Sequence, residues 1–199
     1  MNKKLTQIEI DRYDAIWKVP AYSEVSPGEG LAAMFGKIAK PKTRETLIDL
    51  GCGRGAGGLN LMGMYGLAIT YLDVVKVAGV PEPYICQSLW EPIKVTRPGR
   101  KKWKWDYGYC CDVMEHLPKE FTMLAVKNML AVCEKVFFCI AFLPDRSGPK
   151  HTDIGFAVGA GQLHHTIENF VWWRDRLEEI CTLIDGRDLM GRGVFYVES

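Results

Sequence analysis

The sequence lacks a long apolar run, an apolar stretch after its basic start and any strong excess of one charge. No run approaches the ~20 residues that a membrane-spanning helix needs, and a secretory signal would need an apolar stretch there. Its 25 Lys and Arg nearly balance its 24 Asp and Glu, for a net charge of +1. With 48% hydrophobic residues, disorder is excluded. We expect one well-cored domain in the cytoplasm.

Cysteine and histidine motifs for metal binding are also missing. The seven cysteines form no CxxC or CxH cluster, and there is no HxxxH. Most cysteines stand in apolar runs such as VFFCIAF, where a free thiol behaves as a small hydrophobe. We predict reduced structural thiols and no metal site.

Strand-like and helix-like segments alternate along the chain. This alternation predicts a doubly wound α/β sheet, in which ligands bind beyond the carboxyl ends of the strands. Ser26 and Glu29 form a candidate capping box before the second helix, with Pro27 in its first turn. The expected strands are 46–51, 67–73, 83–89, 105–113 and 135–143, with a terminal hairpin of 181–185 and 193–198; the expected helices are 5–17, 28–39, 57–65, 118–133 and 167–180.

A glycine loop follows the first strand, with Gly51, Gly53 and Gly55 spaced as GxGxG after Asp49. Glycines allow a tight turn and let a ligand lie against bare backbone, beside the free N–H groups of a helix start. The spacing differs from the GxGxxG of dinucleotide loops. Asp49 would repel a pyrophosphate and attract an ammonium, so the loop favours a ligand with an amino-acid moiety.

Two further positions suit a nucleoside. Asp73 ends the second strand, where an acid can bind two ribose hydroxyls. Ser88 and Leu89 lie within the stretch from Gln87 to Trp90 after the third strand and can hold an adenine edge and face. The alternatives are a turn role for Asp73 and ordinary loop packing for the other stretch.

The segments LIDLGCGRG, YLD and YCCDVMEHLP resemble the class I S-adenosylmethionine-dependent methyltransferases over Thr46–Leu143. DVMEHLP is similar to small-molecule O-methyltransferases of the quinone and sugar type. The resemblance implies a Rossmann-like seven-stranded sheet, mostly parallel with an antiparallel C-terminal strand, and helices on both faces. The region between the third and fourth strands is short, so we expect its helix to be reduced.

S-adenosylmethionine is the cofactor that this resemblance implies. The three glycines would contact its methionine part, Asp73 its ribose, and Ser88 and Leu89 its adenine. The complete set of expected cofactor-binding residues is Asp49, Gly51, Cys52, Gly53, Gly55, Asp73, Ser88, Leu89 and Cys111.

Methyl transfer from a sulfonium needs alignment and, for a hydroxyl acceptor, removal of a proton. We expect His116 and Asp112, after the fourth strand, and His164, in the long loop, as catalytic residues. Alternatively, Glu115 and His116 cap the helix after Pro118, and the histidines of the loop cap the next helix. The remaining candidates of this group are His151 and His165.

Several acceptor motifs are absent. No Asn-Pro-Pro-Tyr or Asp-Pro-Pro-Tyr turn follows the fourth strand, and neither Cys110 nor Cys111 follows a proline as in enzymes that attack the cytosine ring. Asp145 and Asp153 alone do not establish a catechol-type metal site. These absences disfavour DNA-base methylation and metal-dependent methylation.

One local charge run opposes the overall neutrality. Residues 94–104 hold six basic residues and no acidic one, with Trp103 and Trp105 close by. The run suits an anionic or glycan acceptor, or a single-stranded nucleic acid. Alternatively, it is a solvated face in which Trp105 begins a buried strand.

Residues 1–45 are expected to form a helical lid or extension, and residues 46–199 the methyltransferase core. Tyr13, Trp17 and Tyr22 would face the cofactor, unless the first helix only packs with Ile16 and Trp17. Of the adjacent pair Trp172 and Trp173, we expect one ring in the core.

The sequence thus predicts a cytoplasmic methyltransferase that transfers a methyl group from S-adenosylmethionine to an oxygen of a small molecule or sugar. Two alternatives stay open. One is a nucleic-acid methyltransferase that uses the basic stretch 94–104, and the other is a cofactor-binding scaffold without turnover. The sequence does not predict an oligomeric state.

Overall fold

The computed structural model describes residues 3–19, 22, 26–95, 103–144 and 162–199. These residues form one seven-stranded sheet with the order β3-β2-β1-β4-β5-β7-β6. β7 is antiparallel to both of its neighbours, and the other strand pairs are parallel. The strands are β1 (Thr46–Leu50), β2 (Ala68–Asp73), β3 (Tyr84–Cys86), β4 (Trp105–Cys111), β5 (Cys133–Ala141), β6 (Thr182–Asp188) and β7 (Arg192–Glu198).

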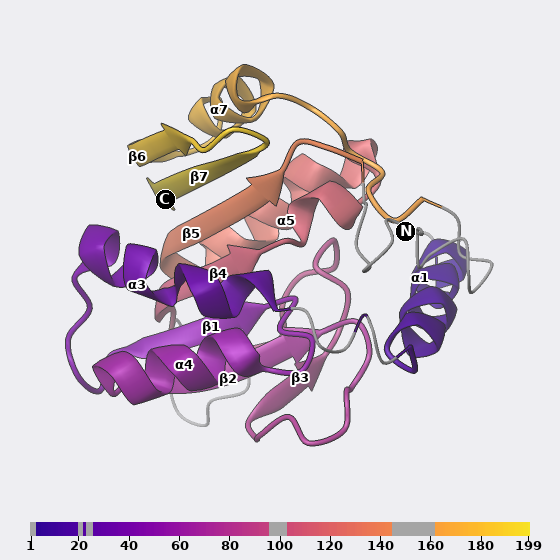
Figure 1. Cartoon of the computed structure of the whole chain (residues 1–199), viewed down its shortest axis with the longest axis horizontal. Coiled ribbons are helices and arrows are strands. Elements are labelled where there is room, and N and C mark those ends of the chain that lie inside the picture. Colours follow the sequence, from indigo (N-terminus) through magenta and orange to yellow (C-terminus); the bar gives the residue numbers. More distant parts are fainter. Residues whose placement is uncertain (1–2, 20–21, 23–25, 96–102, 145–161) are drawn as a thin grey trace.

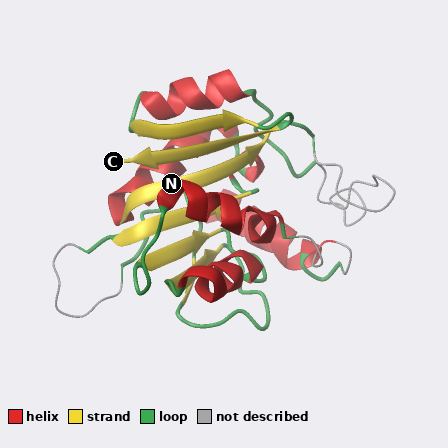
Figure 2. Cartoon of the chain, turned by 60° about the vertical axis from the view of Figure 1, so that its left-hand side comes forward, coloured by secondary structure: helices red, strands yellow, loops and turns green. Residues whose placement is uncertain are grey.

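Helices cover both faces of this sheet, as Figures 1 and 2 show. α3 and α4 pack on one face, and α5 and α7 on the other. The described helices are α1 (Lys3–Ile16), α3 (Pro27–Ala39), α4 (Ala56–Tyr65), α5 (Lys119–Val132) and α7 (Phe170–Glu178), with a short 3₁₀ turn, η1, at Met114–His116. The predicted Rossmann-like α/β fold and its antiparallel last strand are confirmed.

The core has two halves because the central strands are apolar on both faces. On one side, the ring of Phe35 meets Tyr107, Tyr109 and Phe137 edge-on. On the other side, Trp173 is fully buried while Trp172 is only partly buried, as expected for adjacent helical residues. α3 is therefore part of the sheet's cover, although it precedes residue 46.

Two predictions about helix starts are wrong. The Ser26 side chain makes no cap hydrogen bond to α3, so the predicted capping box is wrong; the side chain lines a cavity instead. The helix expected from residue 167 begins at Phe170, because the Asn169 side chain accepts the Trp172 N–H at 2.9 Å. Neither His164 nor His165 is the cap of α7.

The β3 end of the sheet has little helical cover. Within the described residues, no helix lies between β2 and β3 or between β3 and β4. The Gln87 side chain holds the turn after β3, since its amide donates to the carbonyl oxygens of Glu91 and Pro92.

α1 lies beyond the carboxyl ends of the parallel strands (Figure 1). Its Thr6 hydroxyl accepts a hydrogen bond from the Trp90 indole, and Ile16 packs with Leu163. α1 therefore contacts two connections that leave the same edge of the sheet.

All seven cysteines are free thiols, as predicted, and four of them are buried. No helix in the described parts of the chain has the length and apolarity to cross a membrane.

Candidate active site

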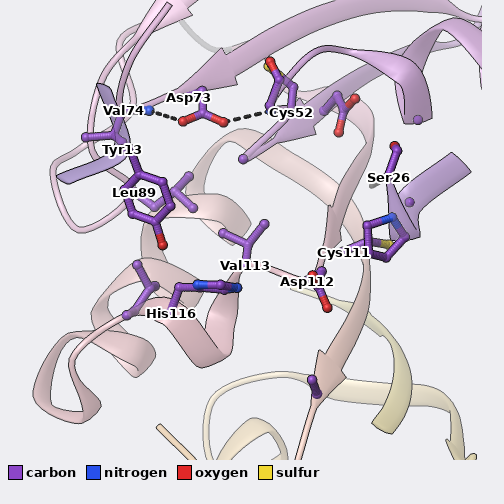
Figure 3. A pocket seen from close by; sticks show the side chains of 18 of the residues that line it. Tyr13, Ser26, Cys52, Asp73, Val74, Leu89, Cys111, Asp112, Val113 and His116 are labelled. Carbon is purple, nitrogen blue, oxygen red and sulfur yellow. Dashed lines mark hydrogen bonds between the residues drawn. The ribbon is translucent and has the colours of Figure 1, made fainter. Parts of the chain in front are cut away.

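A cavity of about 370 Å³ lies at the carboxyl edge of the sheet. Its walls come from the ends of β1, β2, β4 and β5, the start of β7, and α1 (Figure 3). The strand order reverses between β1 and β4, which is where open α/β sheets bind their ligands. The cavity therefore lies where the sequence analysis expected a site.

The glycine loop brings two bare backbone positions to this cavity. Gly51 has φ +75°, and a Cβ there would lie 2.4 Å from the Val113 side chain. Gly53 has φ +52°, and a Cβ there would lie 2.6 Å from the Trp17 ring. Both positions need glycine for conformation and for space.

Gly55 has a different role from the one expected. It does not line the cavity, and a Cβ at this position would point toward Tyr71 and Val80. With φ +78°, Gly55 allows the chain to turn into α4, and Gly57 lines the cavity in its place.

Asp73 connects the end of β2 to the glycine loop. Its Oδ2 accepts the Gly53 N–H at 2.8 Å, and its Oδ1 accepts the Val74 N–H at 2.7 Å (Figure 3). Burial raises the pKa of Asp73 to about 6, although these hydrogen bonds favour the carboxylate. The acid is held rigidly and still lines the cavity.

Asp49 is a second buried acid on the cavity wall. Burial raises its pKa to about 7, the nearby Asp73 adds to the rise, and the Gly58 N–H at 2.9 Å opposes it. A positively charged group in the cavity would stabilise the ionised form of both carboxylates and lower their pKa values.

On the β3 side, Ser88 and Leu89, the residues expected to hold an adenine, line the cavity. The Ser88 Oγ is buried and has no hydrogen-bond partner within the described residues. Gln87 also lines the cavity, but its side chain is engaged in the turn after β3. Ser88 thus offers a polar group that a ligand can satisfy.

α1 and the residues that follow it contribute aromatic side chains to the opposite wall. Tyr13 and Glu9 of α1 line the cavity together with Trp17 and Tyr22, which follow this helix, and no role was predicted for Glu9. Trp17 and Tyr22 meet edge-on at a ring-centroid distance of 5.0 Å. Figure 3 places Tyr13 between Asp73 and His116.

The far end of the cavity holds the expected catalytic residues. Asp112, His116 and His164 all line it, and the His116 and His164 rings lie 4.6 Å apart. Asp112 has φ +61°, an uncommon conformation for a residue other than glycine, and its backbone N–H donates to the Cys139 carbonyl. Cys52 and Cys111 also line the cavity.

Glu115 is fully buried behind this end and does not cap α5. Its Oε1 accepts the Ala141 N–H at 2.7 Å, and its backbone carbonyl accepts the N–H groups of His165 and Thr166. Glu115 thus fastens β5 and the segment that carries His164 to η1. Burial and the neighbouring Asp112 raise the pKa of Glu115.

The histidines have different surroundings. The Nδ1 of His164 lies 2.6 Å from the Leu143 carbonyl oxygen. His116 is buried, which lowers its pKa, and its Nδ1 has no hydrogen-bond partner within the described residues. His165 points elsewhere, with its Nε2 2.6 Å from the Arg12 guanidinium. His151, like Asp145 and Asp153, lies outside the described residues.

The lining also includes Ser26 and Gly28 near the start of α3, and Gly191 and Arg192 before and at the start of β7, none of which was predicted to be a site residue. An antiparallel strand begins where its parallel neighbours end, and Arg192 pairs with Ala141 at the end of β5. The predicted antiparallel last strand therefore indicated that residues at its start, such as Arg192, lie at the ligand-binding edge of the sheet.

Most of the basic stretch, residues 96–102, lies outside the described residues. Of the nearby tryptophans, Trp105 is 4% exposed and bonds to Thr70 through its indole, as expected for a buried strand. Trp103 packs edge-on against Trp105 at a ring-centroid distance of 4.7 Å. The Trp105 ring is therefore not a surface on which a base can stack.

Solved structures share this architecture. A 1,6-didemethyltoxoflavin N1-methyltransferase of Burkholderia thailandensis, solved with its acceptor and S-adenosylhomocysteine, matches with a TM-score of 0.68 and 12% identity, over 100% of this chain and 91% of that chain. The mitomycin 7-O-methyltransferase MmcR matches with a TM-score of 0.60 and 13% identity, over 94% and 60% of the two chains.

A different activity also occurs among the similar structures. The [4+2]-cyclase SpnF matches with a TM-score of 0.63 and 11% identity, over 86% of this chain and 80% of that chain. No protein-family model matches the sequence, and no curated protein sequence matches it. The chain has the fold of the class I S-adenosylmethionine-dependent methyltransferases.

Proposed function

We propose that this protein is a methyltransferase that transfers the methyl group of S-adenosylmethionine to an oxygen of a small molecule or sugar. The observation that carries the proposal is the cavity edge where Asp73 is hydrogen-bonded to Gly53, with Asp49 beside them. The similar 1,6-didemethyltoxoflavin N1-methyltransferase was solved with S-adenosylhomocysteine, which supports the choice of cofactor.

The residues present fit this cofactor. The unpartnered Ser88 Oγ and the Leu89 side chain suit an adenine edge and face, and Asp73 suits the ribose hydroxyls. Asp49 suits the cationic amino group, and the bare backbone of Gly51 and Gly53 leaves room for the methionine part. The side chains of Cys52 and Cys111 complete the wall.

α1 and Trp17, which directly follows it, form the lid in this proposal. Trp17 rests on Gly53, and Tyr13 reaches across to His116 with ring centroids 6.2 Å apart. An incoming cofactor would meet Trp17 first, so α1 has to pack on the cofactor or move with it. The functional division into a lid within residues 1–45 and a core of residues 46–199 is part of the proposal.

The bound cofactor supplies the reactive methyl group. The strand order puts the adenosine-side residues of β2 and β3 on one side of the glycine loop and Asp112, His116 and His164 on the other. A hydroxyl held among those three side chains finds hydrogen-bond acceptors for its proton. This polar acceptor end supports oxygen as the methylated atom.

Two other functions remain as outcomes of the test. SpnF shares the fold and is a cyclase, which keeps open a protein that binds the cofactor without methyl transfer. A nucleic-acid acceptor would use the basic stretch 94–104. Steeply salt-dependent RNA or DNA binding, weakened in K101E and K102E, would support that alternative.

The direct test has two stages. Calorimetry with S-adenosylhomocysteine should show one site that Asp73→Ala weakens and the exposed control Asp188→Ala does not. S-adenosylmethionine should then yield S-adenosylhomocysteine with pools of hydroxylated aromatic compounds and sugars. Absence of binding would refute the proposal, and binding without turnover on any acceptor pool would favour the scaffold.

A further inference from the structure

The buried cluster behind the acceptor end contains one carboxylate and two imidazoles, from Glu115, His116 and His164. One ligand-type atom from each residue lies within 4.8 Å of the other two. Among described residues, this is a group of three such side chains that are all buried. We propose that these three residues form a binding site for one divalent transition-metal ion.

Unsatisfied polar atoms are the first argument for a bound cation. The Nδ1 of His116 is buried without a hydrogen-bond partner in the described parts of the chain, and the buried Oε2 of Glu115 has no hydrogen-bond donor there, with the Asp112 carboxyl as its acidic neighbour. Glu115 is fully buried and His116 is 7% exposed. Leaving such buried polar groups unpaired is unfavourable, and a metal ion would bind both.

The second argument is that the surroundings already orient the ligands. His164 is held by the contact of its Nδ1 with the Leu143 carbonyl at 2.6 Å, which leaves Nε2 to bind an ion. Metal-binding histidines commonly donate their other ring N–H to a carbonyl in this way. The other carboxylate oxygen of Glu115 is likewise fixed by the Ala141 N–H.

A third argument is that the fold brings the ligands together from distant parts of the chain. The carbonyl of Glu115 accepts the N–H groups of His165 and Thr166 at 2.8 and 2.9 Å. These bonds fasten the segment that carries His164 against η1, which carries the other two ligands. The Thr166 hydroxyl adds a bond to the Leu117 carbonyl at 2.7 Å.

The ligand set indicates the kind of ion. Two imidazoles and one carboxylate suit Zn²⁺, Fe²⁺ or Mn²⁺ and leave coordination positions open. Ligand atoms lie about 2.0–2.2 Å from such an ion, so the longest separation has to shorten by about 0.5–1.5 Å when the ion binds.

The open positions would face the cavity, because His116 and His164 line it and Glu115 lies behind them. Under the proposed function, the ion would bind the acceptor and make its hydroxyl more acidic, so His116 would act through the ion instead of as a base, and Asp112 would accept the proton. An acceptor with two adjacent oxygen atoms would fit best. This consequence rests on the proposed function, whereas the metal site does not.

The test uses the full chain after chelator treatment, titrated with Zn²⁺ by calorimetry. We expect one equivalent to bind, and His164→Gln and His116→Gln to weaken binding by about 100-fold or more. The matched control is His165→Gln, because His165 adjoins His164 but contacts Arg12. If Glu115→Gln does not fold, the two histidine variants still decide, with unfolding midpoints in chelator confirming that they fold.

Co²⁺ absorption identifies the ligands independently. Nitrogen and oxygen ligands should give visible bands without a thiolate charge-transfer band. A thiolate band, no stoichiometric Zn²⁺ binding, or equal losses in all three histidine variants would overturn the proposal. A parallel titration of the chelator-treated protein with S-adenosylhomocysteine separates the metal site from the proposed function. Absence of Zn²⁺ binding would overturn only the metal site, and absence of S-adenosylhomocysteine binding would overturn only the proposed function.

Discussion

The carboxylate of Asp73, at the end of β2, accepts a hydrogen bond from the backbone N–H of Gly53 at 2.8 Å. This bond joins two neighbouring strands at their carboxyl ends and fixes the glycine loop relative to the acid. Because the other oxygen of Asp73 is held by Val74, the side chain cannot swing away from the cavity wall. The position expected to bind a ribose is therefore built before any ligand arrives.

Asp73→Ala should weaken S-adenosylhomocysteine binding by about 1.5–3 kcal/mol, the value of a hydrogen bond to a charged group. Calorimetry measures this change, with Asp73→Asn as the conservative comparison. Asp188→Ala, at an exposed position of β6, should bind as the wild type does. Unchanged affinity in Asp73→Ala would remove the ribose assignment.

Gly53→Val should abolish cofactor binding while the protein stays folded. A side chain at this position meets the Trp17 ring and also requires a φ of +52° that valine disfavours. The control is Gly63→Ala on α4, where an added Cβ has no atom within 4 Å. Circular dichroism and calorimetry on both variants would test this, and a Gly53→Val protein that still binds contradicts the loop assignment.

Cofactor affinity should rise with pH up to about 7. Asp49 has a pKa of about 7, so it becomes a carboxylate that attracts the cationic amino group only near neutral pH. The amino group itself loses its proton near pH 8, so affinity should be greatest between about pH 7 and 8. Asp49→Asn should flatten the rising limb in a series of titrations; an identical profile would exclude Asp49 as the partner.

Folding stability of the ligand-free protein should show the opposite trend. Asp49 and Asp73 have pKa values of about 7 and about 6 in the folded state, both raised from 3.8. The folded state therefore holds more protons than the unfolded chain, and stability from these groups is lost as pH rises from about 4 to 7. Urea unfolding at several pH values, with Asp49→Asn as the comparison, would reveal the trend.

His116→Gln should lower turnover much more than cofactor binding, because His116 lies at the acceptor end, away from the adenosine-side residues. Measuring kcat and the dissociation constant of S-adenosylhomocysteine for both the wild type and His116→Gln would test this. His165→Gln, which changes an exposed histidine next to His164, serves as the control. Wild-type turnover in His116→Gln would make this residue purely structural.

The adjacent tryptophans of α7 should differ in their contribution to stability. Trp173 is fully buried in the core, so Trp173→Ala should lower the free energy of unfolding by about 3–5 kcal/mol. Trp172 is only partly buried and lies beneath the Lys119 ammonium at 5.0 Å, so Trp172→Ala should cost far less. Equal losses in denaturant unfolding would contradict the described packing.

Much of the fold was predictable because the local patterns are strong. Apolar runs such as VFFCIAF can only be buried on both faces, and the GxGxG loop marks the edge where a ligand binds. Asp73, Ser88 and His116 follow strands, so the topology alone brings them to one edge. Their positions in the cavity agree with that reasoning.

The other features depend on contacts between distant segments. Nothing near Trp17 in the sequence indicates that its ring rests on Gly53, and nothing near Glu115 indicates that it holds the segment of His164. The cluster of Glu115, His116 and His164 could not be predicted from the sequence for this reason, since its members do not form one compact motif. Ser26 fits a capping pattern, but its side chain lines the cavity instead.

The antiparallel strand β7 also sets the order in which the protein can be completed. It is the last of the seven strands along the chain, yet it lies between β5 and β6 in the sheet. During synthesis, β5 and β6 emerge before the strand that joins them, so their adjoining edges stay unpaired until residues 192–198 have been made. Arg192 and the cavity wall it forms are therefore among the last features of the site to assemble.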